Sequence, residues 1–181
     1  RDMDTQDSYP RDGEIALGFA GFLTFLDRPK EGVNRALQDM SRLGVAVKMI
    51  TGDNRLVAAH VAAMVGLGST RVITGDELDE IDDAALWRLA PVTAVFAEVD
   101  PNQKDRIIRA LRHAGAVVGF LGDGINDAPA MRVADTSLSV DQAVDVARET
   151  ADFVLLDRDL DVIRGGIEEG RRTFANTMKY I

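Results

Sequence analysis

Short apolar runs alternate along the chain with segments of helical periodicity, and this alternation constrains the fold more than any other feature. Strand-like runs are expected at 15–26, 45–50, 71–73, 92–96 and 116–121, the last of the fully buried kind. Helices are expected at 33–44, 54–65, 83–89, 102–113 and about 160–181, with Asp27-Arg28-Pro29 opening the first. Such alternation is typical of parallel strands joined by crossover helices, so we predict an α/β fold: a parallel sheet with helices on both faces.

The composition excludes several classes of function. Acidic residues number 30 against 21 basic ones, a net charge of −9 that argues against binding of DNA or RNA. The chain contains no cysteine, which rules out disulfides and thiol nucleophiles. No apolar run is long enough for a transmembrane helix, and 181 residues suit a single domain. Because the chain starts at Arg1 rather than at Met, we expect it to be part of a larger protein.

Polar residues follow the strand predicted at 45–50, in the order Thr51-Gly52-Asp53-Asn54. A hydroxyl and a bare glycine N–H just before a helix N-terminus form a suitable anion site. An ordinary helix-capping turn is an equally good interpretation, since Thr, Asp and Asn are common N-caps. The triplet recurs at Thr74-Gly75-Asp76, where a short strand leads into an acidic segment, and there we predict only a cap.

A second polar group, Gly122-Asp123-Gly124-Ile125-Asn126-Asp127, follows the strand predicted at 116–121. Glycines on both sides of Asp123 let the backbone approach a ligand closely. Asp123 and Asp127 are hard oxygen donors, suited to a Mg²⁺ ion that also contacts a phosphate. The alternative is a plain turn followed by a helix, with Asp127 as its N-cap and Pro129 in its first turn.

Lys104 lies in the first turn of the helix predicted at 102–113, where the helix dipole disfavours a cation. It shares one face with Ile107 and Leu111, which predicts that its side chain faces the core and meets an anion there. A lysine that extends its ammonium to water is the alternative. Lys48 lacks such a context, and we expect it to be solvated or peripheral.

The motifs occur in the order Thr-Gly-Asp-Asn, Asp-Pro-Asn-Gln-Lys and Gly-Asp-Gly-Ile-Asn-Asp-Ala-Pro-Ala. Together they resemble the later half of the phosphorylation domain of P-type ATPases, which belongs to the haloacid dehalogenase-like superfamily. The stretch at 122–130 is highly specific. Residues 168–181 resemble the stalk that enters the fifth membrane helix, and with 139–148 they most resemble the bacterial magnesium-transporting branch.

This resemblance implies a domain organisation. Residues 1–13 would be a flexible acidic leader, 14–158 part of the phosphorylation domain, and 159–181 a stalk helix leading to an absent membrane segment. The chain would be a cytoplasmic part of a bacterial inner (plasma) membrane protein, with nucleotide-binding, actuator and membrane domains of that protein as its partners. The implied activity is ATP hydrolysis coupled to transport of a cation, Mg²⁺ by this resemblance.

The family's nucleophile is the aspartate of an Asp-Lys-Thr-Gly-Thr motif, which does not occur in this sequence. The chain alone is therefore expected to be inactive, and its sheet would lack the strand between those ending at Thr51 and Gly122. Because buried strand edges need partners, we expect repair of this slot. The two strands would close up, residues 15–25 would fill the slot, or a second chain would supply a strand.

The resemblance also assigns roles to residues of the motifs. Lys104 would neutralise charge on the phosphoryl group transferred from ATP, while Thr51 and the Gly52 N–H would bind its oxygens. Asp123 would ligate Mg²⁺ at the phosphoryl group. Asn126 would donate a hydrogen bond to the phosphate.

The resemblance leaves more than one role open for each of two aspartates. Asp127 would ligate the metal, or would orient Lys104 or a metal-bound water. Asp53 would cap the following helix or contact the hinge of the nucleotide-binding domain. Two functions of other classes are kept as alternatives: a soluble haloacid dehalogenase-like phosphatase, which would need an N-terminal Asp-x-Asp nucleophile motif, and a non-catalytic interaction module.

Overall fold

The computed structural model describes residues 18–23, 29–68, 71–157 and 159–180. Their strands form two three-stranded parallel sheets, with the orders β1-β3-β2 and β4-β5-β6. The first sheet contains β1 (Met49–Ile50), β2 (Val72–Thr74) and β3 (Val95–Ala97). The second contains β4 (Gly119–Leu121), β5 (Thr136–Val140) and β6 (Phe153–Leu155). The predicted α/β class with parallel strands is confirmed.

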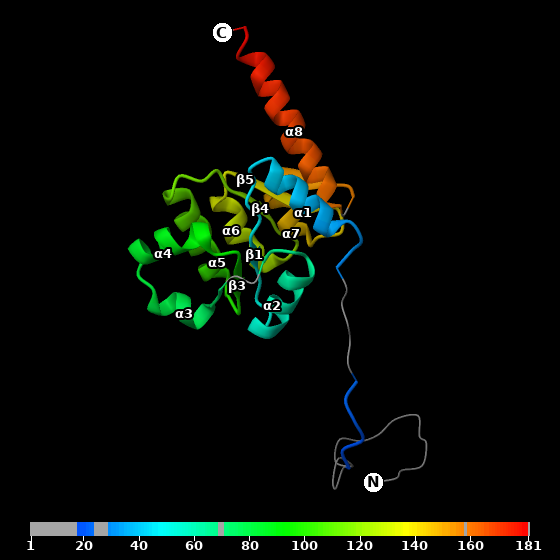
Figure 1. Ribbon diagram of the computed structural model, residues 1–181, viewed down its shortest axis with the longest axis vertical. Helices are drawn as coiled ribbons and strands as arrows, with labels where there is room; N and C mark the ends of the chain where they lie inside the picture. Colours follow the sequence, from blue (N-terminus) through cyan, green and yellow to red (C-terminus); the bar gives the residue numbers. More distant parts are fainter. Residues whose placement is uncertain (1–17, 24–28, 69–70, 158, 181) are drawn as a thin grey trace.

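Helices surround the sheets, and α8 projects from the body of the molecule (Figure 1). The helices are α1 (Val33–Arg42), α2 (Arg55–Met64), α3 (Gly75–Glu80), α4 (Asp83–Leu89), α5 (Pro101–His113), α6 (Ala128–Val133), α7 (Asp145–Thr150) and α8 (Leu160–Thr177). Two short 3-10 turns, η2 (Ala90–Val92) and η3 (Ile125–Asp127), precede β3 and α6. Among the described residues, none of these helices combines the length and the apolar character that a membrane span requires.

One hydrophobic core joins the two sheets. Its buried residues include Ile73 and Phe96 from the first sheet, Phe120 from the second, and Ile107 and Ile108 from α5. α5 packs against α4 on one side and α6 on the other. Because interiors of this kind are close-packed, α5 fixes the strand ends of the two sheets relative to each other.

Local signals predict several helix ends correctly. α2 begins after Asn54, whose side chain caps the helix, and it ends before Gly66 at φ +75°. α5 begins at Pro101, with a reciprocal capping box between Asp100 and Gln103. Proline at the start and glycine after the end follow the usual asymmetry of helix termini.

Other boundaries differ from the prediction. α1 begins at Val33, because Gly32 precedes it at φ +88°, whereas we expected residues 27–29 to open this helix. Residues 27 and 28 lie outside the described part of the chain. The strand expected at 45–50 is shortened to the two residues of β1.

Lys48 is not peripheral, contrary to the prediction. Its ammonium donates hydrogen bonds to Pro91 O at 2.8 Å and to Thr93 O at 2.6 Å. Burial lowers the pKa of Lys48, since desolvation penalises the charged ammonium. Lys48 therefore ties the segment before β1 to the turn that precedes β3.

The expectation of one continuous sheet is wrong for the described residues, because no strand pair joins β1 to β4. β1 pairs with β3, and β4 pairs with β5. Residues 18–23 form no strand, and the rest of the proposed filling segment at 15–25 lies outside the described residues. Strand closure and filling by 18–23 are therefore wrong, because among the described residues β1 and β4 each pair only with a strand of their own sheet. A strand supplied by a second chain stays a prediction.

The prediction that the run at 116–121 is fully buried is also wrong. Within β4 only Phe120 is buried, and Val117 just before the strand is 89% exposed. β4 is an edge strand of its sheet. Its apolar residues therefore lack a neighbour on one side, and full burial needs neighbours on both.

Candidate functional site

Lys104 and Asp127 form an ion pair at the centre of the candidate site. Lys104 Nζ lies 2.7 Å from Asp127 Oδ1, and each side chain is 13% exposed. Lys104 extends from the first turn of α5, whose following turns bury Ile107 and Leu111. The prediction that Lys104 faces the core and meets an anion is confirmed, and the alternative of a solvated ammonium is wrong.

Asp127 also organises the loop at 122–127. Its Oδ2 accepts hydrogen bonds from Asp123 N–H at 3.2 Å and from Gly124 N–H at 3.1 Å. Both carboxylate oxygens of Asp127 are thus engaged, one by an ammonium and one by backbone N–H groups. Asp127 stands at the N-cap position of α6 and Pro129 in its first turn, as predicted, but the Asp127 side chain makes no capping hydrogen bond to α6.

Gly122 gives Asp127 the room that this arrangement needs. A Cβ at position 122 would lie 2.6 Å from Asp127 Cβ. The carbonyl of Gly122 accepts a hydrogen bond from the buried Ser139 hydroxyl at 2.8 Å, and Asp123 O accepts one from Val144 N–H at 3.1 Å. The loop is therefore anchored to β5 and to the start of α7, and these two hydrogen bonds fix the conformation of the loop.

Asp123 and Asn126 are the accessible polar side chains of this loop. Both are exposed, and no donor or acceptor in the described part of the chain bonds to either side chain. Mg²⁺ binds proteins through one or two carboxylates and keeps several waters. The donors present fit Mg²⁺, with Asp123 as a ligand and with Asp127 already committed to Lys104 and the backbone. Within the described ranges, no three acidic or histidine side chains gather into a metal-binding group.

A hollow of about 190 Å³ opens beside Asp123. Its lining consists of Leu121, Asp123, Val140, Leu155, Asp159 and Leu160. The hollow therefore lies at the carboxyl ends of the second sheet, where ligands of parallel α/β folds bind. A larger hollow, about 590 Å³ between α1 and α8, is lined by none of the predicted site residues.

Thr51, Gly52 and Asp53 form a tight turn after β1. Thr51 N–H donates to Phe96 O at 3.0 Å, and the Thr51 hydroxyl accepts from Asp53 N–H at 3.0 Å. Among the described residues, none accepts a hydrogen bond from the Gly52 N–H. Asn54 rather than Asp53 caps α2, so the capping role of Asp53 is wrong, and its side chain is exposed.

Glu98 completes this turn, and no motif in the sequence indicated it. It follows β3 directly and adopts φ +57°. Its Oε1 accepts hydrogen bonds from Asn54 Nδ2 at 2.9 Å and from Arg55 N–H at 3.0 Å, and its own N–H donates to Asp53 O at 3.0 Å. The sequence signal that could have found Glu98 is a charged residue directly after an apolar strand.

α5 connects the two halves of the site. Val99 N–H donates to Thr51 O at 3.2 Å, and Asp100, the next residue, is the N-cap of α5. α5 then carries Lys104 to Asp127. The three motifs all follow the carboxyl ends of strands, as predicted, although these strands belong to two sheets.

Comparison with known proteins shows that the chain is similar to haloacid dehalogenase-like hydrolases and to P-type ATPases. A family model described as haloacid dehalogenase-like hydrolase matches residues 6–135. The magnesium-transporting ATPase, P-type 1, of Escherichia coli (strain K12) is 49% identical over 173 residues, which are 96% of this chain and 19% of the relative. The human calcium-transporting ATPase type 2C member 1 is 37% identical, over 91% of this chain and 18% of the relative.

A solved structure of a zinc-transporting PIB-type ATPase in the E2.Pi state has the same arrangement. It superposes with a TM-score of 0.67 at 29% identity, over 84% of this chain and 21% of that chain. The chain thus spans about a fifth of the length of the curated relatives it matches.

Proposed function

Since the chain belongs to the haloacid dehalogenase-like hydrolases, we propose that it forms the phosphate- and Mg²⁺-binding part of the phosphorylation site of a P-type cation-transporting ATPase. The observation that carries the proposal is the Lys104–Asp127 ion pair beside the loop that presents Asp123. A lysine, a carboxylate and an accessible backbone N–H at strand ends are groups that stabilise the charge of a transferring phosphoryl group.

Each residue of the site has its own role in phosphoryl transfer. Lys104 neutralises charge that develops on the phosphoryl group, and Asp127 holds the ammonium in place for that task. The Thr51 hydroxyl and the Gly52 N–H bind phosphoryl oxygens, and the Asn126 amide donates a further hydrogen bond. Asp123 holds Mg²⁺, whose chemistry is to neutralise phosphate charge.

The nucleophile is proposed to lie elsewhere in the larger protein, because no Asp-Lys-Thr-Gly-Thr motif occurs here. The nucleotide-binding, actuator and membrane domains would belong to that protein as well. On this proposal the chain alone forms no phosphoenzyme. Residues 14–158 would belong to the phosphorylation domain and 159–181 to a stalk, in keeping with the way α8 projects from the body (Figure 1).

Mg²⁺ is the proposed cargo of the pump, and the bacterial inner membrane its proposed location. Relatives named as magnesium-transporting ATPases share 47–50% identity with the chain, whereas those named as calcium-transporting share 37%. This difference supports the magnesium branch.

Incubation of the full-length protein with γ-labelled ATP tests the proposed function. We expect a labelled protein whose phosphate survives acid and is released by hydroxylamine, as an acyl phosphate is. Uptake of Mg²⁺ by vesicles that hold the protein tests the cargo. A protein that hydrolyses phosphate esters without such an intermediate would be a soluble-type phosphatase instead.

A further inference from the structure

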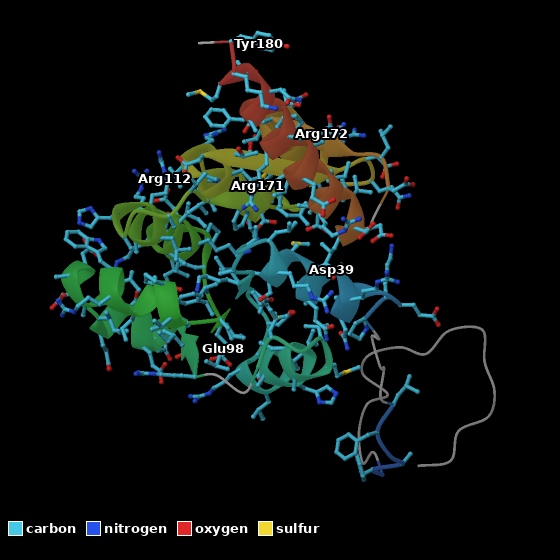
Figure 2. The ribbon with its side chains drawn as sticks, turned by 45° about the horizontal axis from the view of Figure 1, so that its top comes forward. Asp39, Glu98, Arg112, Arg171, Arg172 and Tyr180 are labelled. Carbon is cyan, nitrogen blue, oxygen red and sulfur yellow. The ribbon has the colours of Figure 1, made fainter. Side chains whose placement is uncertain are left out.

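Two identical triplets lie on either side of one residue, Glu98. Thr51-Gly52-Asp53 follows β1, and Thr74-Gly75-Asp76 begins at the last residue of β2. β3 lies between these two strands in the sheet, and Glu98 directly follows β3. Figure 2 shows Glu98 between α2 and the neighbouring green part of the body.

Glu98 and Val99 together make four hydrogen bonds to the first triplet and to the start of α2. Glu98 N–H donates to Asp53 O at 3.0 Å, and Val99 N–H donates to Thr51 O at 3.2 Å. The carboxylate accepts from Arg55 N–H at 3.0 Å and from Asn54 Nδ2 at 2.9 Å. The turn that carries Thr51 and Gly52 is therefore held at both ends by one short segment.

The second triplet fixes Glu98 from the opposite side. A Cβ at Gly75 would collide with Glu98 O and would lie 2.7 Å from Gln103 Oε1. The Gln103 amide donates to Gly75 O at 3.0 Å, which holds this contact in place. Gly75, the first residue of α3, is thus required by the close approach of the Glu98 backbone.

Glu98 adopts φ +57°, a left-handed conformation that residues other than glycine rarely take. Such a conformation persists where the surroundings enforce it, and it is common at functional sites. Here the enforcing contacts are those with Asp53 and Gly75. The carboxylate also lies at the positive end of the α2 dipole, where it accepts the Arg55 N–H.

We propose that Glu98 is the positioning residue of the Thr51–Gly52 turn, an inference that rests on the proposed function. The Glu98 carboxylate accepts a hydrogen bond from the Arg55 N–H, and the Glu98 N–H donates one to the Asp53 carbonyl. These bonds fix the turn so that the Thr51 hydroxyl and the Gly52 N–H face the phosphoryl oxygens. Glu98 itself contacts no phosphate.

Three variants separate the contribution of the Glu98 carboxylate from that of the Glu98 backbone. Glu98→Gly permits the positive φ and removes the carboxylate, while Glu98→Gln keeps an oxygen acceptor without the charge. Gly75→Ala leaves Glu98 intact and displaces its backbone. Glu149→Gln, on the exposed side of α7, is the matched control.

The first measurement is amide hydrogen exchange of Arg55 in the 181-residue chain. Glu98→Gly should raise its exchange rate about tenfold, because the carboxylate acceptor is lost, and Glu98→Gln should restore the protection. Unchanged exchange in Glu98→Gly would overturn the assignment. If Glu98→Gly does not fold, Gly75→Ala carries the same test: its displaced Glu98 backbone should raise Arg55 exchange, and unchanged exchange would overturn the assignment.

The second measurement is the rate of phosphoenzyme formation from ATP in the full-length protein. Glu98→Gly and Gly75→Ala should lower the maximal rate about 10- to 100-fold with little change in KM for ATP, and Glu98→Gln should recover most of it. Wild-type rates in Glu98→Gly would overturn the inference. If the unmodified protein forms no phosphoenzyme, the proposed function fails, and Arg55 exchange still decides whether Glu98 positions the turn.

Discussion

The Lys104 ammonium and the Asp127 carboxylate lie 2.7 Å apart, and this pair joins the first turn of α5 to the loop after β4. The other oxygen of Asp127 accepts the N–H groups of Asp123 and Gly124. One carboxylate therefore fixes both the cation and the backbone that presents Asp123. The geometry of the site depends on this residue more than on any other.

Removal of Asp127 should destabilise the chain more than removal of Lys104. Asp127→Ala leaves a nearly buried ammonium and two backbone N–H groups without partners, so we expect a loss of about 3 kcal/mol in the free energy of unfolding. Lys104→Ala leaves the carboxylate with its backbone donors and should cost about 1–2 kcal/mol. Urea denaturation of both single variants and the double variant measures the coupling between them.

Arg109→Ala is the control for this cycle. It removes an ion pair with Asp105 on the exposed face of α5, where solvent screening leaves such pairs little effect on stability. Additive effects of the Lys104 and Asp127 substitutions would contradict a direct interaction between the two side chains.

The glycines of the site should differ in their tolerance of alanine. A Cβ at Gly122 would lie 2.6 Å from Asp127 Cβ, whereas a Cβ at Gly52 would meet only Val99 O at 3.6 Å. Gly122→Ala should therefore cost about 1–3 kcal/mol of stability, as overpacking does, and Gly52→Ala less than about 1 kcal/mol. Thermal unfolding of the two variants gives the comparison, and equal losses would show that Gly122 is not needed for Asp127.

Asp152 should make stability depend on acid pH. The backbone N–H and then the hydroxyl of Ser137 donate to its carboxylate, and they hold its pKa below the ordinary value of 3.8. The unfolded chain then binds the proton more readily, so this contribution is present above pH 3.8 and is lost as pH falls through the folded-state pKa. Asp152→Asn should be less stable than the unmodified chain at neutral pH, and the difference should shrink in acid.

Urea titrations at neutral pH and below pH 3.8 measure this effect. Asp157→Asn, at an exposed aspartate after β6, should follow the unmodified chain at both pH values. A constant difference between Asp152→Asn and the unmodified chain would contradict a lowered pKa at this carboxyl.

Mg²⁺ should bind the 181-residue chain weakly, in the millimolar range or above. Asp123 is an accessible ligand, but both oxygens of Asp127 already have partners, and a single carboxylate holds Mg²⁺ poorly. Calorimetry with MgCl₂, with Asp123→Asn as the control, measures the affinity. Tight binding that survives Asp123→Asn would place the metal elsewhere.

The helices that frame the site follow from local sequence. Asp100, Pro101 and the spacing of Ile107 and Leu111 predict α5 and the inward face of Lys104. Asn54 at the start of α2 carries a similar signal. These features depend on neighbours within one or two turns, which is why sequence patterns reveal them.

Features that depend on distant partners were not predictable. The division into two sheets depends on which strands pair with each other across the fold. The apolar sequence of β4 does not indicate which strand is its partner. Glu98 has no motif around it, and its positive φ is imposed by Asp53 and Gly75 from two other strand ends. Lys48 likewise finds its carbonyl acceptors at Pro91 and Thr93, far along the chain.

Phosphoenzyme formation from ATP by the full-length protein is the most direct test of the proposed phosphoryl-transfer site. Lys104→Ala and Asp123→Asn should each lower it about 100-fold or more, because each removes charge stabilisation from the transferring phosphoryl group. His60→Ala and Asp76→Asn, at exposed positions outside the site, should leave it unchanged. Wild-type phosphoenzyme levels in Lys104→Ala or Asp123→Asn would contradict the assignment of this site to phosphoryl transfer.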